Sequence, residues 1–137
     1  MCPMRAVLLA TASKYVSELN TFNSTSFSAL HTPACVTHFI TPTHRSSKSN
    51  EEFLELCRLS RSIFTTMLVV ILDERRTIVD ELTRKVMLHL KYVYWTTVDT
   101  HEAESITVLA MEDSCLLINA VFIFTDDLKH FIFEQGP

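Results

Sequence analysis

Glycine is almost absent from this chain. Among its 137 residues only Gly136 is a glycine. A glycine commonly marks the point where a strand bends sharply, because it has no side chain to collide with its neighbours. We therefore expect any strongly curved sheet in this protein to owe its bend to β-bulges, in which an extra residue turns the strand.

Long hydrophobic runs are also missing. The longest apolar stretches are Met67–Leu72 and Ala120–Phe124, whereas a helix that crosses a membrane needs about 20 consecutive apolar residues. The 12 basic residues are scattered among 16 acidic ones, with a small cluster at Arg75 and Arg76. The sequence therefore predicts no membrane segment and no nucleic-acid partner.

Paired metal or redox ligands are missing too. The four cysteines include no Cys-x-x-Cys pair, so a zinc site or a redox pair has no support. His38 and His44 lack an acidic residue at metal-ligand spacing, and we expect no metal. The central cysteines lie in apolar surroundings, where a free thiol behaves as a small buried side chain. A reduced, cytoplasmic setting fits this usage.

What the chain does contain is enough apolar material for one core. The length suits a single domain over residues 1–137, and 47% of the residues are hydrophobic, which excludes a disordered chain. The mean hydropathy of +0.19 is high for a soluble protein. It predicts an apolar cavity or a buried oligomer face in addition to the core.

The first half of the chain predicts helices. Apolar residues recur at helical spacing over residues 4–20 and again over residues 50–64. Ser49 and Glu52 have the spacing of a capping box, in which each side chain bonds the backbone N–H of the other. We therefore place the start of the later helix at this pair.

A short helix and a strand are expected between these two helices. Asn23 or Ser24 can cap a helix that Pro33 ends. Val36–Ile40 is rich in β-forming residues and predicts a first strand, followed by a polar loop over residues 41–49.

The second half predicts long strands. Met67–Leu72 is a continuous β-type run that we expect to be covered on both faces. Lys85–Val98 is apolar on both faces, and residues 104–111 and 116–125 follow with a tight turn between them. Residues 78–82 leave two alternatives open, a continued strand or an inserted turn of helix.

This order of elements predicts an α+β fold. Three helices followed by at least three long antiparallel strands suggest a strongly curved antiparallel sheet with helices filling its concave side. A pocket would then lie between the sheet and the long first helix.

Several short strings support a more specific interpretation. Leu19-Asn20 ends the first helix, Thr32-Pro33-Ala34-Cys35 precedes the first strand, and Asn50-Glu51-Glu52-Phe53 opens the third helix. Asp73-Glu74 follows the first long strand, and the last strand ends in Ile123-Phe124-Thr125-Asp126. Together they resemble the fungal SnoaL-like family over roughly residues 6–133. The resemblance implies a cone-shaped α+β barrel with cystatin-like (nuclear transport factor 2-like) topology. It also implies a natural-product isomerase or cyclase.

Some pocket positions of that family carry other residues here. His101 and Ser105 stand where the family commonly has tyrosines, and Ile123 stands where it has a glutamate. His38 occupies a position that is often arginine in related enzymes. The resemblance thus implies the family's frame with altered chemistry.

His38 and His101 are the predicted catalytic residues, because an imidazole can accept or donate a proton near neutral pH. Each has a structural alternative: His38 as a half-buried ring bonded to the backbone, and His101 as an exposed residue at a strand start. Ser105 shares a strand face with His101 and could orient a polar group of the substrate.

Four further residues complete the predicted substrate-binding set. They are His89, Tyr92, Ile123 and Asp126. His89 could instead form an outward-facing pair with Lys91. Tyr92 could instead belong to the core or to a dimer interface, and Asp126 could be a helix cap rather than a base.

From these residues we expect a cofactor-independent isomerase or cyclase. It would act on an apolar secondary-metabolite intermediate by general acid/base catalysis. The alternative is a non-catalytic ligand-binding or dimeric interaction protein of the same fold, which the loss of an acid at Ile123 favours. The helices can cover only one face of the apolar strands, so we also predict a homodimer through the sheet. The other expected partner is a small hydrophobic substrate.

Overall fold

The computed structural model describes residues 3–64 and 66–126. Its helices are α1 (Pro3–Thr21), α2 (Ser24–Leu30) and α3 (Asn50–Ile63), with a short 3-10 turn η1 (Glu74–Arg76). Its strands are β1 (His31–Ile40), β2 (Arg45–Ser49), β3 (Thr66–Ile71), β4 (Ile78–Asp80), β5 (Lys85–Trp95), β6 (Thr100–Met111) and β7 (Ile118–Phe124).

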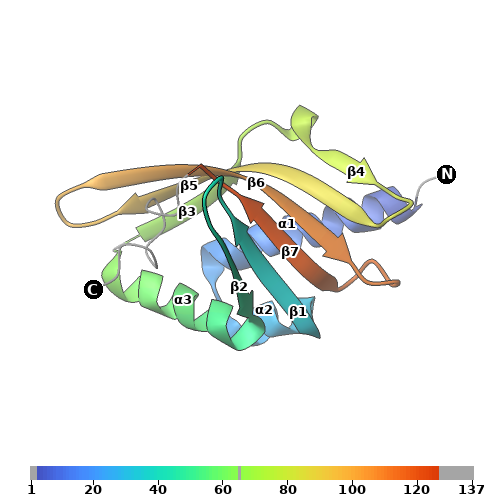
Figure 1. Cartoon of the computed structure of the whole chain (residues 1–137), viewed down its shortest axis with the longest axis horizontal. Coiled ribbons are helices and arrows are strands. Elements are labelled where there is room, and N and C mark those ends of the chain that lie inside the picture. The colour runs from blue at the N-terminus through green and yellow to red at the C-terminus, as the bar shows by residue number, and fades with distance from the viewer. Residues whose placement is uncertain (1–2, 65, 127–137) are drawn as a thin grey trace.

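The strands form one curved sheet in the order β2-β1-β7-β6-β5-β3, with β4 beside β5. Neighbouring strands are antiparallel, except that β1 runs parallel to β7. All three helices lie on the same side of the sheet (Figure 1). The predicted α+β fold, with helices packed in a curved sheet, is therefore confirmed, although the sheet is mixed rather than wholly antiparallel.

Helix α1 lies across the concave face of the sheet. Its apolar stripe is buried there and comprises Leu8, Ala12, Tyr15, Val16 and Leu19. At the end of the helix Asn20 bonds the backbone of Val69 in both directions: the side-chain Nδ2 donates to the carbonyl at 2.8 Å, and Oδ1 accepts from the N–H at 2.7 Å. The Asn side chain thus pairs with β3 as a neighbouring strand would, which fixes the end of α1 on the sheet.

Helix α3 begins and ends as its sequence predicts. Both bonds of the capping box between Ser49 and Glu52 are present. Near the other end, Arg61 donates to the carbonyls of Leu19 and Asn20 at 3.0 and 2.9 Å. These carbonyls belong to the last turn of α1 and lack partners within that helix, so Arg61 fastens α3 to α1.

Two strand predictions need correction. The residues expected to form a polar loop contain β2, which pairs with β1 from Ser49 opposite Val36 to Arg45 opposite Ile40. The strand β1 also begins at His31, earlier than predicted. A hydrophilic segment pairs here because β1 otherwise offers an open edge, and its backbone groups need partners.

Two further predictions concern the middle of the chain. Residues 78–82 divide into the strand Ile78–Asp80 and a turn, which settles the open alternative. β3 was expected to be covered on both faces, but Leu68 is 41% exposed on the side away from the helices. The predicted tail beyond Asp126 lies outside the described residues.

The sheet curves without glycine, as expected. The pairing register shifts between His31 and Val36 and again between Ala110 and Met111. Tight reversals use residues with positive φ that are not glycine: Phe22 at 36°, Arg84 at 56° and Cys115 at 64°. Each side chain there crowds its own backbone, a strain that the surrounding packing must offset.

Candidate active site

A cavity of about 60 Å³ lies between α1, α3 and the concave face of the sheet. Its wall is formed by Tyr15, Leu19, Phe39, Phe53, Leu56, Cys57, Ser60, Met67, Val69, Tyr92, Tyr94 and Ile123. Leu56 and Met67 are half-buried and the other lining residues are buried, so the cavity comes nearest to the surface between α3 and β3. An apolar wall with a few polar tips is typical of small-molecule sites.

Tyr15 brings a phenol into this cavity from the middle of α1. The residue is 1% exposed, and its hydroxyl has no hydrogen-bond partner among the described residues. Burial raises the pKa of this phenol well above its usual value, and the neighbouring Tyr92, Cys57 and Cys35 act in the same direction. A buried hydroxyl without a partner costs about 1–3 kcal/mol.

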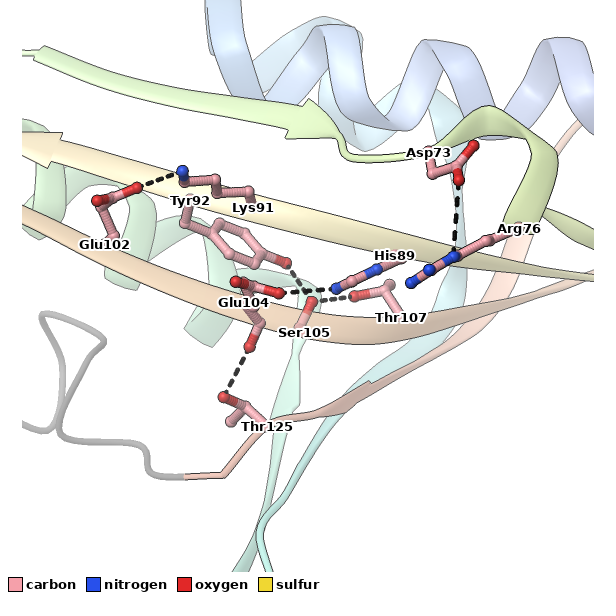
Figure 2. Close-up of polar contacts among 10 residues, drawn as sticks. All are labelled: Asp73, Arg76, His89, Lys91, Tyr92, Glu102, Glu104, Ser105, Thr107 and Thr125. Atoms are coloured by element: carbon pink, nitrogen blue, oxygen red, sulfur yellow. Dashed lines mark hydrogen bonds and ion pairs between the residues drawn. The ribbon is translucent and has the colours of Figure 1, made fainter.

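A chain of hydroxyl groups continues from the cavity wall into the sheet. The hydroxyls of Tyr92 and Ser105 lie 3.1 Å apart, and that of Ser105 lies 2.8 Å from the Thr107 hydroxyl. Figure 2 shows this row running from β5 to β6. Burial raises the pKa of Tyr92, although its bonds to Ser105 and Thr107 oppose the shift. The phenol therefore stays protonated at neutral pH.

His101 lies at one end of the concave face. Its ring meets Phe64 edge-on at 6.1 Å, and Phe64 stacks on Tyr94 of the cavity wall at 4.8 Å. The imidazole Nε2 is 3.9 Å from a carboxylate oxygen of Asp99, and the side chain is half-buried. His101 is thus separated from the cavity by one layer of aromatic rings.

The remaining polar groups of the wall are neutral. Burial raises the pKa of the Cys57 thiol to about 12, so no thiolate forms near neutral pH. The Ser60 hydroxyl donates to the Leu56 carbonyl at 2.9 Å. Among the described residues, no carboxylate or imidazole lines the cavity. The wall can therefore donate hydrogen bonds and shape a ligand, but a base must come from elsewhere.

The predicted pair His38 and His101 does not share this cavity. His38 points to the outer face of the sheet, where it stacks on Phe122 at 4.8 Å and bonds the Ser47 hydroxyl at 2.9 Å. Successive side chains of a strand alternate between faces, and Phe39 occupies the inward position of β1. The resemblance implied a pocket position for His38, but the residue lies outside this cavity.

The other predicted residues divide between the two faces. Tyr92 and Ile123 line the cavity, and Ser105 lies directly behind Tyr92. His89 lies on the outer face, as the alternative predicted, but its partner is Glu104 at 2.9 Å rather than Lys91 (Figure 2). Asp126 is exposed and lines a surface hollow together with Glu102 and Glu104 of β6.

Tyr15 is a cavity residue that sequence spacing does not single out. Its position fits the apolar stripe expected for residues 4–20, although the polar tip of a tyrosine at a core position is a usable signal. The alternation of β5 was a second signal, since Tyr94 shares the inner face with Tyr92.

Two classes of feature are not found in the part of the chain that the structure describes. No cluster of three or more His, Cys, Asp or Glu side chains is arranged to hold a metal ion over residues 3–64 and 66–126. No helix there is long and apolar enough to span a membrane.

Known proteins resemble the chain in both sequence and structure. Protein S of the austinoid biosynthesis clusters of Emericella nidulans is 35% identical over 126 residues, which cover 92% of this chain and 90% of that protein. PrhC of Penicillium brasilianum has a TM-score of 0.85 at 24% identity, over 96% of this chain and 92% of that one. The BvnE pinacolase of Penicillium brevicompactum has a TM-score of 0.85 at 20% identity, over 98% and 92%. These two structural likenesses show the fold. No protein-family model matches the chain.

Proposed function

The chain belongs to the fungal SnoaL-like family that includes the austinoid biosynthesis cluster proteins, and from that premise we propose that it is an isomerase or cyclase of secondary metabolism. Its substrate is an apolar intermediate held in the cavity between α1, α3 and the sheet. The observation that carries the proposal is the apolar wall, whose polar atoms include the phenols of Tyr15 and Tyr92.

The neutral cavity wall supports a scheme in which the phenols donate hydrogen bonds and a residue outside the wall acts as the base. A buried phenol can donate a hydrogen bond to a substrate oxygen on which negative charge develops, and such donors are most effective where water is excluded. An isomerisation of this kind moves a proton from one substrate carbon to another and exchanges no electrons with a second molecule. It therefore needs neither an oxidant nor a reductant, which supports the proposal that no cofactor takes part.

The base in this scheme is His101. Its imidazole lies on the concave side of the sheet, with Nε2 3.9 Å from a carboxylate oxygen of Asp99. Because Phe64 lies between His101 and Tyr94 of the cavity wall, the scheme requires the Phe64 ring to turn aside so that the proton of the reacting carbon comes within reach of the imidazole. His38 has no part in this scheme.

The test is to delete the gene in the organism that carries it and compare metabolites by mass spectrometry. We expect one metabolite to disappear and a compound of identical mass to accumulate, because isomers share a formula. The purified, dialysed protein should convert the accumulated compound without additives. Accumulation of a compound that differs in mass, or conversion only with an added redox cofactor, would contradict the proposal.

One observation favours a second candidate function, a binding protein without chemistry. The described part of the cavity wall holds no carboxylate and no imidazole. A pure binding protein would hold the metabolite tightly, yet deletion of its gene would change only the amount of product. That result would support the second function over the first.

A further inference from the structure

The Tyr15 hydroxyl serves no purpose in the fold that the described residues reveal. It is buried in an apolar wall and has no hydrogen-bond partner among residues 3–64 and 66–126. A phenylalanine would fill the same space between α1 and the sheet without leaving a polar atom unsatisfied. The unsatisfied Tyr15 hydroxyl lowers the stability of the fold. We therefore expect it to form a hydrogen bond with a ligand that binds in the cavity.

Other buried hydroxyl groups near Tyr15 do have hydrogen-bond partners. Ser60 and Tyr92 line the same cavity, and both have partners at 2.9 and 3.1 Å. Thr11 lies one turn earlier on α1 and donates to the Cys115 carbonyl at 2.6 Å. Other buried polar atoms among the described residues also lack a partner, such as His31 Nε2 and Ser46 Oγ, but of these atoms only the Tyr15 hydroxyl belongs to a residue of the cavity wall.

We propose that the Tyr15 hydroxyl donates a hydrogen bond to a neutral oxygen atom, such as a ketone carbonyl, on an otherwise apolar ligand. This inference rests on the proposed function, since it assigns a recognition role within the same cavity. Tyr15 would then select oxygenated ligands over hydrocarbons of the same shape, because an apolar ligand leaves the hydroxyl unsatisfied.

The composition of the cavity wall indicates that the ligand oxygen is neutral. No Lys or Arg side chain is among the lining residues in the described part of the chain, and burying a carboxylate without a cation is strongly unfavourable. A carbonyl or ether oxygen needs only a neutral donor. Because burial keeps the phenol protonated, Tyr15 remains a donor over the whole pH range in which proteins are handled.

The test compares two probes of nearly the same shape, cyclohexanone labelled with ¹³C at the carbonyl and methylenecyclohexane. Binding of each is followed by NMR titration of the wild-type protein and of Tyr15→Phe. We expect Tyr15→Phe to weaken cyclohexanone binding about 3- to 10-fold, the ratio that one net hydrogen bond supplies. Methylenecyclohexane should bind equally well or better. The carbonyl carbon of bound cyclohexanone should resonate further downfield in the wild type than in Tyr15→Phe, because only the wild type donates a hydrogen bond to it.

Unfolding measurements on Tyr15→Phe and on one control variant, Thr11→Val, separate recognition from folding. Tyr15→Phe should be as stable as the wild type or more so, whereas Thr11→Val should lose stability and keep its cyclohexanone affinity. Equal losses for both probes in Tyr15→Phe, or no loss for cyclohexanone, would overturn the proposal. So would a marked loss of stability in Tyr15→Phe, because it would reveal a structural partner. Neither probe has to react, so this outcome is independent of the metabolite comparison that tests the proposed function.

Discussion

Single hydroxyl groups have different roles in this protein. The Tyr92 hydroxyl belongs to a buried chain with Ser105 and Thr107 and is satisfied there. Thr107 is fully buried and Ser105 is 3% exposed, so water cannot replace a lost member easily. This chain fixes the side chains at the centre of β5 and β6, behind the cavity wall.

Removing one member of that chain should therefore lower stability. We expect Tyr92→Phe to decrease the free energy of unfolding by about 0.5–1.5 kcal/mol, the net value of one hydrogen bond. Urea unfolding followed by circular dichroism measures this. An unchanged or higher unfolding free energy would show that the bond between Tyr92 and Ser105 contributes nothing.

The two predicted catalytic histidines can be separated by activity. With the substrate found by gene deletion, His101→Ala should lower turnover about 10²- to 10⁴-fold, which is the usual effect of losing a general base. His38→Ala is the matched control, because His38 lies on the outer face against Phe122. It should keep turnover within about twofold. Full activity of His101→Ala would show that His101 is not the base.

At the scale of elements, the helices carry their own boundary signals. Ser49→Ala deletes the side chain that accepts from the Glu52 N–H at 3.2 Å. We expect a loss of about 0.5–2 kcal/mol in unfolding free energy, as for other N-cap serines. Ser17→Ala, on the exposed face of α1, is the control and should change it by less than about 0.5 kcal/mol. Equal effects of the two variants would contradict the role of the cap.

Such local signals explain which elements could be predicted from the sequence. The helices α1, α2 and α3 follow from apolar spacing and caps at Asn23 and Ser49, which act within a few residues. β2 has alternating exposed and half-buried polar residues and no apolar signal. It forms because β1 provides an open edge to pair with. That pairing depends on the folded sheet and cannot be recognised from the residues of β2 themselves.

The candidate site was partly predictable for the same reason. Both faces of β5 are mostly apolar, so the sequence did not decide which one faces inward, and the predicted substrate-binding set took His89 from one face and Tyr92 from the other. In β1 the two possible inner rows both mix polar and apolar residues: Thr37 stands between Cys35 and Phe39, and His38 stands between Val36 and Ile40. Only the pairing with β7 decides which row faces inward. His38 was therefore assigned to the wrong face.

The whole molecule buries several acids that stay protonated. Burial raises the pKa of both Cys35 and Cys57 from 9.0 to about 12. Between these values the unfolded thiols lose protons that the folded ones keep, so ionisation favours the unfolded state. Stability is then fully present below pH 9 and falls as the pH rises toward 12.

We therefore expect the unfolding free energy to fall above pH 9, by up to about 1.4 kcal/mol per pH unit for each thiol. Urea unfolding at pH 8, 9 and 10 measures the slope. Cys57→Ala should make that slope shallower, because one titrating group is gone. A slope that is the same in the variant and the wild type would show that the Cys57 thiol is not responsible.

Assembly is the second property of the whole molecule. The sheet face away from the helices exposes Leu68, Ile106 and Phe124 by 41%, 37% and 41%. A twin molecule could cover this face with a standard interface of about 800 Å² per subunit. We keep the homodimer as a prediction, and sedimentation should give twice 15.7 kDa at micromolar concentration.

A charge on the proposed interface should separate the subunits. Ile106→Lys places an ammonium group in the centre of the outer face and should shift sedimentation to the monomer. Val98→Lys is the matched control, since Val98 is 90% exposed outside the strands, and it should leave the assembly unchanged. A wild-type protein that sediments as a monomer would contradict the prediction directly.

The parallel pairing of β1 with β7 has a consequence for how the chain is made. β1 is synthesised early, yet its partner spans Ile118–Phe124. Until that last strand leaves the ribosome, β1 and β2 can form only a hairpin, and an isolated hairpin is marginal in water. The cavity wall contributed by Phe39 and Ile123 therefore closes in one late step. A nascent chain would expose the apolar inner face of β1 until β7 is made, and during that interval it depends most on chaperones.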